Sequence, residues 1–66
     1  MAIASPVYRM ADRMVDGRLA EIILAYHQDG HSAEHISRLL WSEHHVDVSG
    51  QTLRRWIPVI LKEAVA

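Results

Sequence analysis

The most informative segment of the chain runs from residue 30 to residue 57 and reads GHSAEHISRLLWSEHHVDVSGQTLRRWI. Its apolar residues recur at intervals of three and four, as they do on one face of a helix, first in one segment and then in a second. Ser32 and Ser49 each stand just before such a segment, where a serine side chain caps the free N–H groups of a helix. Val48 precedes the second cap and is expected to pack on Leu53, four residues into the helix. The stretch therefore predicts two helices joined by a turn.

The N-terminal part of the chain continues this helical spacing. Ser5 followed by Pro6 is typical of an N-cap and a first helical position, and Gly30 is typical of a helix end. The pair Asp16-Gly17 interrupts the apolar stripe: either Asp16 caps a new helix, or Gly17 bends a single helix at a cost of about 1 kcal/mol. We expect the core face to be formed by Val7, Met10, Met14, Val15, Leu19, Ile22, Ile23 and Tyr26. An alternative is that the residues nearest the start anchor a dimer, namely Met1, Ile3, Val7 and Tyr8.

Pro58 interrupts the helical pattern near the C-terminus. A proline inside a helix lacks an N–H and clashes with the carbonyl four residues earlier, here that of Arg54. We therefore expect the helix that follows Ser49 to end or kink near residue 57, and residues 58–66 to form a C-terminal tail or a short helix beginning at Pro58. This segment has more apolar residues than one packed face needs, so it is a candidate dimer seam: Val59, Ile60, Leu61, Ala64 and Val65.

Length and composition limit the classes of protein that the chain can belong to. Its 66 residues predict one domain, residues 1–66, folded as an all-α bundle of three to five helices. The absence of cysteine excludes disulfides, thiolate zinc sites and thiol catalysis, and it fits a reducing cytoplasm. No apolar run approaches the roughly 20 residues that cross a bilayer, and no leader-like pattern follows Met1. We expect a cytoplasmic protein with no membrane partner, whose small core favours association with a second copy or with a partner protein.

The motif in residues 30–57 resembles the helix-turn-helix of homeodomain-like bacterial and bacteriophage regulators and of the DNA-binding domains of transposases and recombinases. One departure is His45, which stands where the resembling segment usually has glycine, and a left-handed turn strains histidine. The residues that carry the resemblance are Gly30, Ser32, Ile36, Ser37, Leu39, Leu40, Val46, Val48, Ser49, Thr52, Leu53, Arg54, Arg55, Trp56 and Ile57.

The spacing within residues 32–57 also assigns roles to individual positions. Small Ser37 allows two helices to cross closely. The packed core of the motif is expected to be Ile36, Ser37, Leu40, Val48, Leu53 and Trp56. With Leu53, Trp56 and Ile57 turned inward, the side of the last helix that points outward is expected to carry Gly50, Gln51, Arg54 and Arg55.

The resemblance implies that helix 49–57 lies in the major groove of duplex DNA. Arg54 would then read guanine and Gln51 adenine, each through two hydrogen bonds, with Gly50 beside them at the base edges. Contacts to phosphate position the protein without specifying sequence. The residues expected to make them are Arg38, Ser49, Thr52 and Arg55.

The net charge of −1 argues against nucleic acid at first sight, because a DNA-binding surface is expected to be basic. The charge is unevenly distributed, however. Residues 49–62 contain Arg54, Arg55 and Lys62 and no acidic residue, so the acidic side chains lie elsewhere. The sequence therefore predicts one basic helix, with a net negative charge on the rest of the chain.

Five histidines invite a metal-site interpretation, and residues 31–35 match the H-x-x-E-H pattern of some zinc peptidases. That pattern needs both histidines on one continuous helix, whereas Ser32 is the expected cap. We expect no metal, no cofactor and no enzyme activity, and we interpret the histidines as surface residues.

The leading hypothesis is a sequence-specific transcriptional regulator of double-stranded DNA, resembling a small phage or bacterial repressor or Cro-like protein. A homodimer would read two half-sites about one helical turn apart, in the cytoplasm of a bacterial cell and at its nucleoid. Two alternatives stay open. One is an excisionase, or recombination directionality factor. The other is a protein-binding helix-turn-helix module, such as an antirepressor or host-factor binder, that does not bind DNA.

Overall fold

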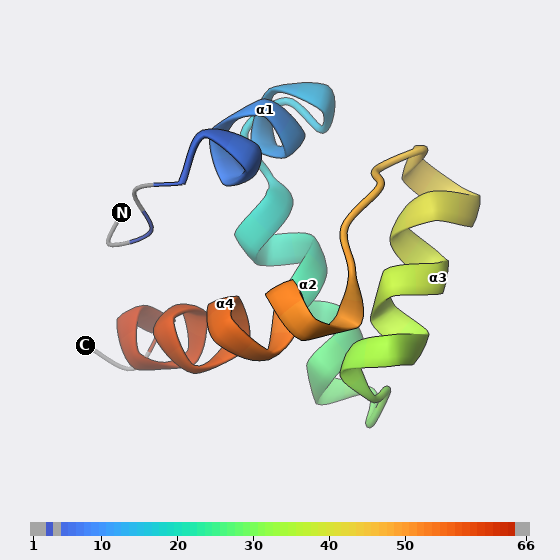
Figure 1. Ribbon diagram of the computed structural model, residues 1–66. Helices are drawn as coiled ribbons and strands as arrows, with labels where there is room; N and C mark the ends of the chain where they lie inside the picture. Colours follow the sequence, from blue (N-terminus) through green and yellow to red (C-terminus); the bar gives the residue numbers. More distant parts are fainter. Residues whose placement is uncertain (1–2, 4, 65–66) are drawn as a thin grey trace.

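The computed structural model describes residue 3 and residues 5–64 of the chain. In these residues the chain forms four helices and no strand (Figure 1): α1 (Pro6–Met14), α2 (Leu19–Gln28), α3 (Ala33–His44) and α4 (Gly50–Ala64). This confirms the predicted all-α bundle. No helix in the described ranges is long and apolar enough to span a membrane. Met1 and residues 65–66, which figured in the expected dimer contacts, lie outside the described residues.

The chain turns sharply between α1 and α2, so the interruption at residues 16–17 separates two helices. Asp16 and Gly17 both adopt left-handed φ angles, 57° and 77°. The N–H of Gly17 donates to the carbonyl of Asp12 at 2.8 Å, a bond that closes the end of α1. Asp12 also accepts the N–H of Leu19 at 2.9 Å. Of the two alternatives that the sequence left open, a single bent helix is therefore excluded, and in the new helix it is the Asp12 side chain, not that of Asp16, that accepts the first N–H.

α1 buries a different face from the one expected. Tyr8 is only 2% exposed, and its ring meets that of Trp56 edge-on, with centroids 5.0 Å apart. Ala11, one turn after Tyr8, and Val15, directly after the helix, are also buried. The large aromatic ring determines the rotation of α1, since it buries more apolar area than a methionine. The prediction of a core face formed by Val7, Met10 and Met14 was wrong, as was the use of Tyr8 in a dimer anchor. The exposed fractions are 54% for Val7, 64% for Met10 and 59% for Met14.

α4 continues through Pro58 to Ala64, so the expected end of the helix near residue 57 was wrong. Pro58 lies on the exposed side of α4, while Ile60 is buried with Trp56 on the opposite side. A proline removes one backbone hydrogen bond from the ladder, but the helix keeps its packed face on both sides of it. Ile60 thus belongs to the core of the chain itself.

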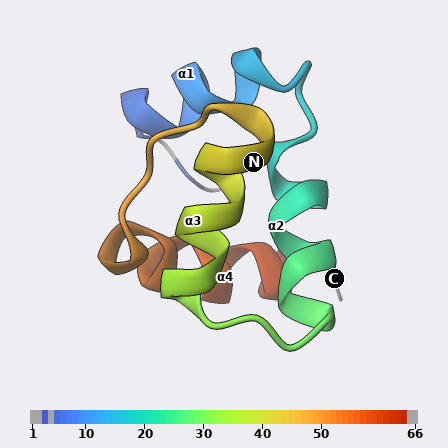
Figure 2. The same ribbon diagram turned by 90° about the vertical axis from the view of Figure 1, so that its right-hand side faces the viewer.

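The core lies between α4 and the other helices. Figure 2 shows α2 and α3 side by side, with α4 passing across them, and α4 packs against both. The buried apolar residues are Tyr8, Ala11, Val15, Leu19, Ile23, Ile36, Leu40, Val46, Val48, Leu53, Trp56 and Ile60. Every predicted core residue of the motif except Ser37 is among them, and Ser37 is half-buried.

Candidate nucleic-acid interface

The turn between α3 and α4 begins with a left-handed residue. His45 has φ 57° and ψ 30°, and its N–H donates to the carbonyl of Trp41 at 3.0 Å. Glycine adopts this left-handed conformation freely, whereas histidine adopts it at some cost in strain. The chain then extends through Val46 and Val48, which are both buried. Because both valines are packed in the core, the turn lies against the rest of the protein. The chain then continues directly into α4 (Figure 1).

Ser37 anchors the far end of this turn. Its hydroxyl donates to the backbone carbonyl of Val48 at 2.5 Å. The sequence indicated only that a small residue is needed there. The structure adds a hydrogen bond between α3 and the residue immediately before the cap of α4.

The N-terminus of α4 is capped and accessible. Ser49 accepts the N–H of Thr52 at 3.2 Å, and its hydroxyl lies 3.0 Å from the Thr52 hydroxyl. The predicted cap is therefore confirmed. Ser49 is exposed and Thr52 is half-buried, so the positive end of the helix dipole lies at the surface. Such a helix end favours a negatively charged group such as phosphate.

The outer face of α4 carries three of the side chains expected to meet DNA. Gln51, Arg54 and Arg55 are exposed, whereas Leu53 and Trp56 are buried on the opposite face. The helical period thus separates a packed side from a polar side, as the spacing predicts. Two guanidinium groups and one amide are chemically suited to bind phosphates and base edges.

Gly50 differs from these three. A Cβ built at Gly50 would lie 2.8 Å from Glu34 Oε2 and 3.2 Å from Glu34 Cα, closer than packed atoms normally come. Gly50 therefore faces α3, and the expectation that it points outward beside Gln51 was wrong. Its lack of a side chain allows the first turns of α3 and α4 to approach each other closely.

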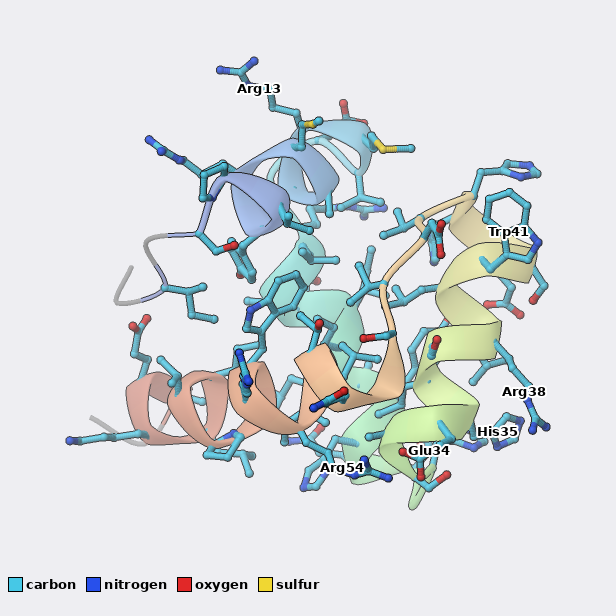
Figure 3. All side chains as sticks on the ribbon, viewed as in Figure 1. Arg13, Glu34, His35, Arg38, Trp41 and Arg54 are labelled. Atoms are coloured by element: carbon cyan, nitrogen blue, oxygen red, sulfur yellow. The ribbon has the colours of Figure 1, made fainter. Side chains whose placement is uncertain are left out.

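Glu34 is the residue at this site that the sequence reasoning missed. Its carboxylate forms an ion pair with the guanidinium of Arg54 (Figure 3), and the two side chains are 52% and 61% exposed. The sequence offered one signal, an acidic residue in the first turn of α3, which is accounted for by the helix dipole alone. Only the folded chain brings that carboxylate to Arg54.

Arg38 lies on α3, on the side away from α4 (Figure 3). It is exposed, and so is His35 one turn earlier. The Nδ1 atoms of His31 and His35 lie 2.9 Å apart, so the two rings share one hydrogen bond beside the cap of α3. In the described part of the chain no three histidine, cysteine or acidic side chains are grouped so that they could hold a metal ion.

Two tyrosines have raised pKa values. Burial, and after it the negative charges of Asp12 and Glu63, raise the pKa of Tyr8 to about 12. Burial, and after it the hydrogen bond to Glu43, raise the pKa of Tyr26 to about 12. The Tyr26 hydroxyl donates this bond to the Glu43 carboxylate and so connects α2 to the last turn of α3. Tyr8 packs against Trp56 of α4 and Tyr26 bonds to α3, so both tyrosines stabilise the helices that carry the candidate interface.

No protein-family model, curated protein or solved structure matches this chain. The functional assignment therefore depends on the geometry of the chain itself. α3, the turn and α4 bring together an exposed helix N-terminus, a face carrying Gln51, Arg54 and Arg55, and a carboxylate, that of Glu34, paired to one of the arginines.

Proposed function

We propose that this protein binds duplex DNA through α4, with Gln51 and Arg54 at the base edges of the major groove and Arg55 at the backbone. The observation that supports this most directly is the exposed face of α4 opposite Leu53 and Trp56. A helix about 10 Å wide fits the major groove, where donors and acceptors distinguish the base pairs. Ser49 and Thr52 are proposed to contact phosphates beside the N-terminus of α4, and Arg38, on the side of α3 away from α4, a phosphate further along the backbone.

The charge distribution supports the same surface. Residues 49–62 hold three of the seven basic residues and none of the eight acidic ones. The acidic remainder of the chain repels phosphate, so DNA is expected to approach by the α4 side. With a net charge of −1, one copy would bind DNA weakly, and a dimer reading two half-sites is the form that we favour.

We further infer a regulatory role, in which occupancy of a site controls transcription, as a repressor does. An excisionase would use the same contacts and would also bend its DNA beside an integrase. Once a preferred sequence is known, the electrophoretic mobility of circularly permuted fragments separates the two. A strong bend centred on the site favours the recombination role, and an unbent site favours the repressor.

DNA binding itself is tested by fluorescence anisotropy with random duplex DNA at about 50 mM and about 200 mM salt. Two to four phosphate contacts would lower the affinity about tenfold to a hundredfold over that range. The double variant Arg54→Ala/Arg55→Ala is expected to lose most of the binding. The matched control, Arg9→Ala/Arg13→Ala, removes the same charge from α1, and Figure 3 shows Arg13 at the opposite end of the molecule from Arg54. Equal losses in the two variants, or no binding at low salt, would contradict the proposal.

Sequence preference is tested by selection from a random pool of duplexes. We expect a guanine at one position of the enriched site, and the variant Arg54→Ala should relax the preference at that position alone. The expected loss of discrimination is about 1–3 kcal/mol. If no sequence is enriched in the selected pool, the protein binds DNA only non-specifically, and base reading by Arg54 is contradicted.

A second candidate, a protein-binding module, is favoured by the exposed apolar side chains of α1. Val7, Met10 and Met14 line a cavity of about 180 Å³ together with Ala11, Val46 and Asp47. Flexible methionines make adaptable contact surfaces for partner proteins. Absence of DNA binding at low salt would favour this candidate.

A further inference from the structure

Glu34 is held from three directions at the point where α3 meets α4. It lies in the first turn of α3, where the helix dipole stabilises a carboxylate. It lies directly against Gly50, whose missing side chain leaves room for it. Its carboxylate also pairs with Arg54, one turn further along α4. The arginine proposed to read a base is therefore already engaged with a carboxylate of the same chain.

This pairing affects the two kinds of DNA contact differently. A phosphate carries a full negative charge, so the neighbouring Glu34 carboxylate repels it and lowers the attraction of Arg54 for the backbone. A guanine edge offers two neutral acceptors, O6 and N7, which a carboxylate repels less. The guanidinium has five N–H donors, enough to bind guanine with one edge and a carboxylate with another.

We propose that Glu34 is a positioning and specificity-determining residue of the DNA interface. It holds the Arg54 guanidinium in the orientation that reads guanine, and it suppresses non-specific binding of Arg54 to phosphate. This inference rests on the proposed DNA-binding function. It assigns a role to an acidic residue beside the basic side chains of the interface.

The test compares Glu34→Gln with Glu21→Gln, a variant that removes the same charge from α2. Glu21 is exposed and lines a cavity with Ile60 and Ala64, near the C-terminal half of α4 and away from Arg54. Each variant is titrated with random duplex DNA and with the duplex selected by the wild-type chain, at several salt concentrations. Circular dichroism confirms that each variant is folded before titration.

Glu34→Gln is expected to bind random duplex about 3- to 10-fold more tightly, with a salt slope steeper by about 0.9, the value for one additional phosphate contact. Its affinity for the selected duplex should rise less, so the ratio of specific to non-specific affinity falls. Selection with Glu34→Gln should relax the preference for guanine at the position read by Arg54. Glu21→Gln should change both affinities by the same small factor and leave the ratio and the salt slope unchanged.

The same comparison in an Arg54→Gln background shows whether Glu34 acts through Arg54. The effect of Glu34→Gln on the affinity ratio is expected to disappear there. If the effect persists, or if Glu34→Gln behaves as Glu21→Gln does, the inference is overturned while DNA binding by α4 stands. If the wild-type chain does not bind DNA at low salt, the proposed function and this inference both fail.

Discussion

The hydroxyl of Ser37 donates a hydrogen bond to the backbone carbonyl of Val48, eleven residues away and at the far end of the turn between α3 and α4. Val48 is buried and directly precedes Ser49, the cap of α4. The bond therefore sets where α4 begins relative to α3. The direction of the exposed face of α4 depends on this contact as much as on the residues of α4 themselves.

Replacing Ser37 with alanine should destabilise the fold by about 1 kcal/mol, because the Val48 carbonyl loses its donor. Urea unfolding followed by circular dichroism measures the free energy of unfolding. Ser42→Ala is the control, since Ser42 is exposed and its hydroxyl donates to the Leu39 carbonyl of its own helix, at 3.4 Å. Equal losses of stability in the two variants would show that the bond to Val48 does not hold the turn.

Truncation of α1 side chains tests which face of that helix is packed. Tyr8→Ala removes a buried ring from its contact with Trp56 and should cost about 3–5 kcal/mol, enough to unfold much of a domain of this size. Met10→Ala, on the exposed side, should change stability by less than about 0.5 kcal/mol. Thermal unfolding of the two variants gives the comparison. A larger loss of stability for Met10→Ala than for Tyr8→Ala would mean that the methionine side of α1 is packed, as the sequence predicts.

Pro58 leaves one position of the α4 ladder without an N–H donor. Pro58→Ala should therefore stabilise the chain by about 1–2 kcal/mol. Alanine removes the cost of proline inside a helix, and the greater conformational entropy that it gives the unfolded chain offsets part of this gain. Pro6→Ala is the matched control, because Pro6 occupies the first position of α1, where proline is tolerated. Chemical denaturation of both variants measures the difference. Destabilisation by Pro58→Ala would mean that the ring itself contributes packing.

Stability should fall in strongly alkaline solution. Tyr8 and Tyr26 have pKa values of about 12 in the folded chain, against 10.0 for an ordinary tyrosine. The unfolded chain therefore releases these protons first, so the free energy of unfolding decreases as the pH rises from about 10 towards about 12. Below about pH 10 both states keep the protons and these groups add no pH dependence.

Urea titrations at about pH 9, 10 and 11 check this prediction. Tyr26→Phe should show a shallower decrease, because one of the two titrating hydroxyls is gone, together with its hydrogen bond to Glu43. An identical pH dependence in wild type and Tyr26→Phe would place the pKa of Tyr26 at its ordinary value.

Structural features that depend on neighbours three or four residues apart follow from the local residue pattern. Ser5, Ser32 and Ser49 all cap helices, each by accepting the N–H three residues later. Gly30 ends α2 with φ 89°, and the inward face of α4 follows the predicted spacing. Such interactions form inside one helix turn, so the local residue pattern is sufficient to predict them.

Structural features that depend on contacts between distant residues arise only when the helices pack together. The rotation of α1 follows from the packing of Tyr8 on Trp56, and the continuation of α4 through Pro58 keeps Ile60 in the same core. The pairing of Glu34 with Arg54 likewise needs α3 and α4 to meet. The residues in each of these contacts lie far apart in the sequence, so the periodicity of a single helix does not predict that they meet. They come together because whole helices pack against one another.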